Sequence, residues 1–83
     1  MPKDSFRVIF AADVESEFRE VHFPFRRQLN QRIQKLKAEP RPADARIVSE
    51  EFHLLRVERW GLVYEIDDLG RTLTLWAVMD LGL

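Results

Sequence analysis

The hydrophobic pattern of this chain changes its period near residue 42, and that change limits the folds available to it. Before this point apolar residues recur every three or four positions, as they do on one side of an α-helix. Beyond it they alternate with polar residues, as in strands that bury one face. A chain of 83 residues without cysteine has room for one modest core and cannot form disulfides. We therefore expect a single α+β domain, residues 1–83, with a helical hairpin packed on a mostly antiparallel sheet.

One strand and two helices are expected in the first half of the chain. Residues 6–10 alternate and predict the strand, and Asp13 is the expected N-cap of a short helix. Pro24 suits the first turn of a second helix, which Pro40 then prevents from continuing. The expected apolar faces are Phe6, Val8 and Phe10 in the strand, Val14, Phe18 and Val21 in the first helix, and Phe25, Leu29, Ile33 and Leu36 in the second.

The second half predicts three strands and an optional fourth at the edge. The expected elements are an edge strand at 45–48, strands at 52–57, 62–66 and 72–78, a turn at 58–61 and a hairpin turn at 67–70. Gly70 is free to adopt a positive φ in the hairpin turn. Trp76 is expected in the core. For Trp60 two interpretations stay open, packing within the protein and contact with a partner. The predicted order is β-α-α-β-β-β, with a further strand left open.

Charge and composition exclude several classes of function. The net charge of -1 provides no general attraction for nucleic acid. No apolar run resembles a signal peptide or a membrane span, so we expect a cytoplasmic protein without membrane contact. His22 and His53 lack a second His or Cys at metal spacing. The sequence therefore predicts no metal and no other cofactor.

Four strings, in this order, resemble the RelE/ParE superfamily of type II toxin–antitoxin toxins. They are FRVIFAADVESEFREV, LNQRIQKLKAEPRP, LLRVERWGLVYEIDD and RTLTLWAV, which together reach from residue 6 to residue 78. Each string is mainly a packing pattern, and the ordered set of four is what makes the resemblance specific. The resemblance implies a cognate antitoxin that wraps the sheet and helices with an extended or helical segment.

The chain departs from this family where the family's ribonucleases carry basic residues. Those members usually have an arginine directly after the aromatic residue of the third string, whereas here Gly61 follows Trp60. They also tend to have basic residues on the preceding strand and after the final strand, where this chain has Leu54 and Leu81. RNA cleavage through the 2′-hydroxyl needs cations beside the phosphate and a group that moves protons. The resemblance therefore implies a degenerate active site.

Few side chains remain as candidates for chemistry or binding. His53 is the one candidate general base, and Arg56 and Arg59 are candidates for a remnant phosphate site. The alternative for both arginines is a solvated strand face with cross-strand partners such as Glu58 or Glu65. The basic residues near 26–37 predict a solvated helix face that an acidic antitoxin tail or DNA could use. The predicted partner-binding residues are Arg56, Arg59, Trp60, Arg32 and Lys35.

Two classes of function stay open. In the first, the chain is a toxin-like component that binds an antitoxin and lacks ribosome-dependent mRNA endonuclease activity. In the second, it is an active toxin, either an mRNA interferase with a rearranged site or a gyrase inhibitor of the ParE type. The residues at Leu54, Gly61 and Leu81 favour the first class, and therefore a protein that is not an enzyme. Homodimerisation stays open in both.

Overall fold

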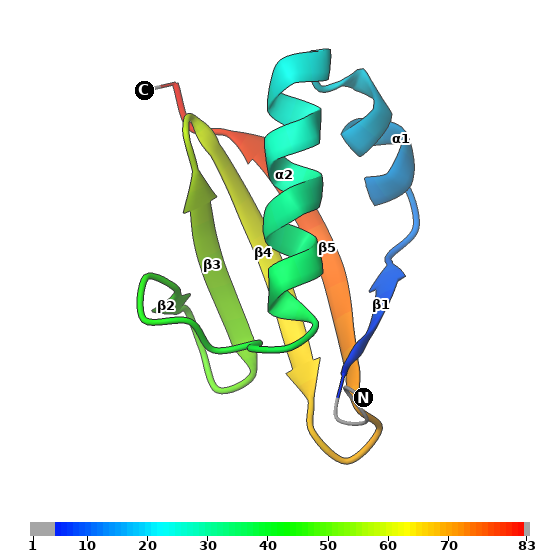
Figure 1. Ribbon diagram of the computed structural model, residues 1–83, viewed down its shortest axis with the longest axis vertical. Coiled ribbons are helices and arrows are strands. Elements are labelled where there is room, and N and C mark those ends of the chain that lie inside the picture. The colour runs from blue at the N-terminus through cyan, green and yellow to red at the C-terminus, as the bar shows by residue number, and fades with distance from the viewer. Residues whose placement is uncertain (1–4, 83) are drawn as a thin grey trace.

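Two helices pack on one face of a five-stranded mixed sheet in the computed structural model, which describes residues 5–82 (Figure 1). The strand order is β1-β5-β4-β3-β2, with β1 parallel to β5 and the other neighbours antiparallel. The elements are β1 (Arg7–Phe10), α1 (Val14–Glu20), α2 (Phe23–Leu36), β2 (Arg46–Ile47), β3 (Phe52–Val57), β4 (Trp60–Asp67) and β5 (Thr72–Asp80). The predicted α+β class and element order are confirmed. No helix among residues 5–82 is both long and apolar enough to cross a membrane.

The predicted apolar stripes hold the helices on the sheet. Leu29, Ile33 and Leu36 are buried along one side of α2. Asp13 does lie at the N-cap of α1, but its side chain accepts no hydrogen bond from the helix. Its φ is 74°, and its backbone oxygen instead accepts the N–H of Glu17 at 3.1 Å. The predicted N-cap position is therefore confirmed, but the Asp13 side chain makes no capping hydrogen bond.

The antiparallel strands alternate as the period of two predicts. Leu55 on β3 pairs with Leu62 on β4, and both are fully buried beneath the helices. The remaining buried residues of this face are His53, Tyr64, Ile66, Leu73 and Leu75. The Tyr64 hydroxyl donates a 2.8 Å hydrogen bond to the backbone oxygen of Pro40. This bond ties the segment that follows α2 to the middle of the sheet.

Both predicted turns differ in detail from the structure. The turn between β3 and β4 consists of Glu58 and Arg59 alone, with Glu58 at φ 58°. Trp60 and Gly61 already belong to β4, so the predicted turn at 58–61 is two residues too long. At the next turn the positive φ belongs to Arg71, at 55°, and not to Gly70.

The small size of Gly70 allows the flexible Asp67 carboxylate to lie close to its backbone. A Cβ there would lie 2.7 Å from Oδ2 of Asp67, whose Oδ1 accepts the Gly70 N–H at 3.1 Å. Any larger residue would push the Asp67 carboxylate away from the turn.

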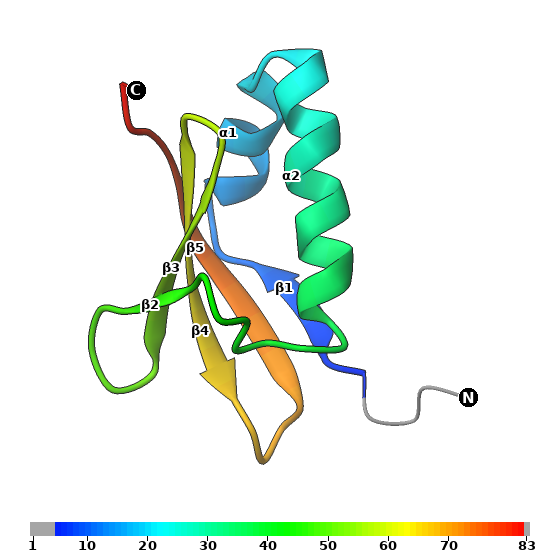
Figure 2. The same ribbon diagram turned by 60° about the vertical axis from the view of Figure 1, so that its left-hand side comes forward.

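The second face of the sheet is left open by the helices (Figure 2). Side chains on this face alternate with the buried ones, and several are large and apolar. They include Ile9, Phe52, Leu54, Val63, Trp76 and Met79. The prediction that Trp76 belongs to the core is wrong, since its side chain is 47% exposed. Its Nε1 donates a 2.8 Å hydrogen bond to Glu65, which satisfies the indole at the surface.

Candidate functional site

Three residues at which the family resemblance implies missing cations meet on the open face of the sheet. Leu54 comes from β3, Gly61 from β4, and Leu81 directly follows β5. A Cβ on Gly61 would lie 3.1 Å from Cδ1 of Leu54 and 3.4 Å from both methyl groups of Leu81. Gly61 does not have a positive φ, so its backbone does not demand glycine. The missing side chain instead leaves room for the two leucines.

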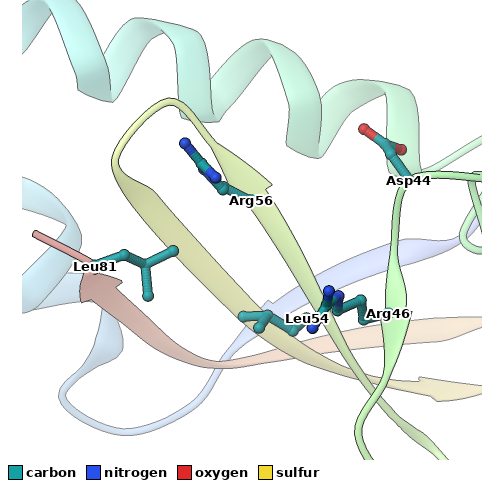
Figure 3. A pocket seen from close by; sticks show the side chains of 5 residues that line it. All are labelled: Asp44, Arg46, Leu54, Arg56 and Leu81. Carbon is teal, nitrogen blue, oxygen red and sulfur yellow. The ribbon is translucent and has the colours of Figure 1, made fainter. Parts of the chain in front are cut away.

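The two leucines belong to an open hollow of about 530 Å³. Figure 3 shows their side chains extending toward each other along the floor. The residues that line this hollow are Asp44, Arg46, Leu54, Arg56 and Leu81. The site therefore combines an apolar floor with two guanidinium groups at its rim.

Asp44, the carboxylate of the hollow, is already engaged. Its Oδ1 accepts a hydrogen bond from Nη2 of Arg32 on α2 at 3.2 Å. This hydrogen bond is the main cause that lowers the pKa of the Asp44 carboxyl below its ordinary value. In contrast, Arg56 donates only to a backbone oxygen, that of Glu58, at 2.9 Å. The charge left over at the hollow is therefore positive.

A second ion pair positions Leu81. Arg59 donates from Nε to Oδ1 of Asp80 at 2.9 Å and from Nη2 to Oδ2 at 2.8 Å. The backbone oxygen of Arg59 also accepts the N–H of Leu81 at 2.7 Å. This fork lowers the pKa of the Asp80 carboxyl and raises the pKa of Arg59. Arg59 thus fixes the residue after β5 against the β3–β4 turn.

The predicted partner-binding residues do not form one surface. Among them, Arg56 lines the hollow, and Arg32 touches it only through its bond to Asp44. Trp60 is half-buried on the helix side, where its ring lies 6.4 Å from that of Phe25. The other two members are Arg59, at the β3–β4 turn, and Lys35, exposed on α2.

His53 lies on the opposite side of the sheet from the hollow. Its side chain is buried, and its ring stacks on that of Tyr64 with a centroid distance of 5.5 Å. A base in this position does not reach a substrate on the open face. Within residues 5–82, no group of three His, Asp or Glu side chains is placed to hold a metal ion.

Sequence reasoning missed Arg46 as a lining residue of the hollow. Arg46 belongs to a two-residue edge strand and pairs with Leu54 on β3. A strand this short carries no alternating pattern that assigns a face to its side chains. The one available signal was the antiparallel pairing of the predicted edge strand with its neighbour.

The contact between Gly61 and Leu54 predicts a coupling between two substitutions. Gly61→Ala gains about 0.4–1 kcal/mol from a less flexible unfolded chain, but its methyl group must displace the Leu54 side chain. We expect Gly61→Ala to be more favourable in a Leu54→Ala background, by about 0.5–1 kcal/mol in urea unfolding. Gly61→Ala combined with Ile9→Ala, two strands away, should be additive. Equal effects of Gly61→Ala in all backgrounds would show that the predicted contact is absent.

Comparisons with known proteins were made on sequence and on structure. No protein-family model matches the chain, and no curated protein matches it in sequence. Solved structures do match. The isolated RelE toxin of E. coli superposes with a TM-score of 0.86 at 16% identity, covering 95% of this chain and 87% of the toxin.

Two complexes of related proteins match as well. The archaeal RelE–RelB complex from Pyrococcus horikoshii gives a TM-score of 0.81 at 13% identity, covering 94% of this chain and 97% of the matched chain. The intact RelBE toxin–antitoxin complex of E. coli gives 0.80 at 18% identity, covering 89% and 94%. The chain therefore has the fold of the RelE toxins, as the sequence resemblance predicted.

Proposed function

We propose that this chain is a toxin-like component of a type II toxin–antitoxin module, that it binds a cognate antitoxin in the cytoplasm, and that it lacks ribosome-dependent mRNA endonuclease activity. The observation that carries this proposal is the cluster of Leu54, Gly61 and Leu81 on the open face of a RelE-like sheet. The fold supports the first part, and the chemistry of the cluster supports the last.

The cluster lacks what RNA cleavage requires. Negative charge develops on the phosphate in the transition state, and donors or cations must already be in place beside it. Leucine methyl groups supply neither charge nor hydrogen bonds. The nearest imidazole, that of His53, is buried beneath the helices and has no access to the same face. We therefore assign the open face to binding.

The antitoxin partner is supported by the structural neighbours and by the surface. Both RelE–RelB complexes described above share this fold, and each contains an antitoxin chain. The open face of this chain exposes apolar side chains that a partner would remove from water, among them Trp76 and Met79. Affinity purification of the tagged chain from its native host should therefore yield a stoichiometric small protein. Purification of the chain alone, under conditions that preserve complexes, would contradict this part of the proposal.

Inducible expression in bacteria tests the loss of endonuclease activity. We expect normal growth and intact messenger RNA, measured by culture density and by primer extension, because the cluster supplies no cations. E. coli RelE under the same promoter is the positive control. If growth stops, Leu29→Ala separates the causes, since a destabilised core removes specific activity but not the toxicity of an aggregate. The proposal would be overturned if the wild-type chain arrests growth and cleaves messenger RNA while the Leu29→Ala variant does neither.

One observation favours the alternative, an active toxin. Arg56 is exposed beside the hollow and binds no carboxylate among residues 5–82. Such a toxin would be an mRNA interferase with a rearranged site or a ParE-type gyrase inhibitor, which a supercoiling assay distinguishes. In either case Arg56→Ala should abolish growth arrest. His53, the candidate general base, is buried and would have to act from that position.

A further inference from the structure

We propose that the hollow binds an acidic, apolar segment of the partner protein, with an apolar side chain between Leu54 and Leu81 and a carboxylate between Arg46 and Arg56. This inference rests on the proposed function, because it names the chemistry of the antitoxin segment that covers the open face. The occupant is a peptide segment of a second protein, not a small molecule, a nucleic acid or another copy of this chain.

The floor of the hollow suits an apolar side chain. The two leucine side chains extend toward each other (Figure 3). Both lie next to Gly61, which has no side chain to fill the space between them. Both leucines are only partly buried in the isolated chain. An aliphatic or methionine side chain placed there removes their exposed methyl groups from water, which is the main driving force for such contacts.

The rim suits a carboxylate. Four other arginines of the described chain each form a salt bridge with a carboxylate: Arg19 with Glu15, Arg32 with Asp44, Arg41 with Asp68 and Arg59 with Asp80. Arg46 and Arg56 have no such partner among residues 5–82, although both are exposed at the hollow. A guanidinium fork binds a carboxylate with two parallel hydrogen bonds, so these two residues select an acidic ligand.

The apolar surface continues beyond the hollow across the sheet. Gly61 pairs with Met79, and further apolar residues of the same face that are exposed or partly exposed lie on β4, β5 and β1. The members of this open-face stripe are Met79, Val63, Trp76 and Ile9. A ligand that uses the hollow and the stripe together spans several strands. This extent fits a segment of polypeptide and exceeds a small molecule.

Single-stranded RNA fits the same site less well. Its phosphates suit Arg46 and Arg56, but RNA-binding sheets also stack bases on aromatic rings. The hollow is lined by leucines and by no aromatic residue, and Asp44 adds a carboxylate to its lining. The exposed Trp76 of this face lies outside the hollow, and its Nε1 already donates a hydrogen bond to Glu65. The combination of aliphatic floor and cationic rim therefore favours an acidic peptide over a nucleic acid.

Selection from a random linear peptide library, displayed on phage, tests the inference with the whole chain as bait. We expect enriched peptides to carry Asp or Glu close to Leu, Met or Ile. Arg56→Glu and Leu81→Asp should each weaken their binding about tenfold or more, as expected when a charge-assisted pair or a central anchor is lost. The matched controls are Arg19→Glu on α1 and Leu69→Asp in the β4–β5 turn, which should bind as the wild type does.

Several results would overturn the inference. They are enriched peptides without carboxylates, equal binding by Arg56→Glu, preferred binding of a single-stranded RNA through the same residues, and self-association that Leu81→Asp abolishes. Urea midpoints of all variants must match the wild type, and Arg46→Glu replaces any variant that does not fold. Failure here is distinct from failure of the proposed function. If a host partner binds the Arg56→Glu and Leu81→Asp variants as tightly as the wild type, only the proposal about the hollow is wrong. If no partner is found at all, the proposed function itself is wrong.

Discussion

Replacing Leu29 with alanine is expected to lower the free energy of unfolding by about 3–5 kcal/mol, the upper part of the range for a fully buried leucine. Leu29 has no exposed surface and lies on the stripe of α2 that faces the sheet. A domain of this size is stable by only about 5–10 kcal/mol, so the variant should lose roughly half of its stability and unfold at a much lower urea concentration. Urea unfolding followed by circular dichroism measures the change.

Phe23→Ala is the matched control for this substitution. Phe23 begins the same helix, but it is 62% exposed, and the guanidinium of Arg26 lies over its ring. Its removal should change the free energy of unfolding by about 0.5 kcal/mol, as is usual for surface positions. Similar losses for both variants would mean that α2 is not held by its buried stripe.

The second large effect is a loss of stability in alkaline solution, caused by Tyr64. Burial raises the pKa of Tyr64 from 10.0 to about 12, because the phenolate would lose its hydration among apolar side chains. The unfolded chain releases this proton at lower pH than the folded one does. The contribution of the Tyr64 proton to the free energy of unfolding is therefore fully present below pH 10. It is lost as the pH rises through the pKa that Tyr64 has in the folded protein. A difference of about two pKa units corresponds to roughly 3 kcal/mol.

The chain contains one tyrosine, so the phenolate absorbance reports this residue alone. In the folded protein the absorbance should rise near the raised pKa, whereas in denaturant it should rise at the ordinary one. Tyr64→Phe should abolish most of the alkaline loss while costing about 1–2 kcal/mol at neutral pH, because the oxygen of Pro40 loses its donor. An ordinary pKa in the folded protein would refute the burial of this hydroxyl.

The periodicity of the first half of the chain predicted the core-facing residues of the first strand and of both helices. In the second half the pattern failed where local geometry outweighs it. Trp76 lies between Leu75 and Ala77 in a continuous apolar run. When both faces of a strand carry apolar residues, the sequence does not show which face the helices cover. Gly61 suggested a turn, yet it is a strand residue whose small size serves the neighbouring leucines.

The sequence predicted individual residues of the candidate site but not that they meet on one surface. The family resemblance identified Leu54, Gly61 and Leu81, but their contact depends on the strand register, which pairs Arg56 with Gly61 and Gly61 with Met79. Arg46 enters through an edge strand of two residues. Long-range register and short edge strands are the features that local sequence patterns do not determine.

The connection of Arg59 to Asp80 and Leu81 affects how this protein should be handled. A purification tag or fluorophore attached behind Gly82 would leave the domain within two residues of the hollow and would compete there with any ligand. Because β1 runs parallel to β5, the start of β1 lies at the opposite end of the sheet (Figure 1). Labels and surface attachments are therefore better joined to the amino-terminal end, where they leave the open face of the sheet accessible.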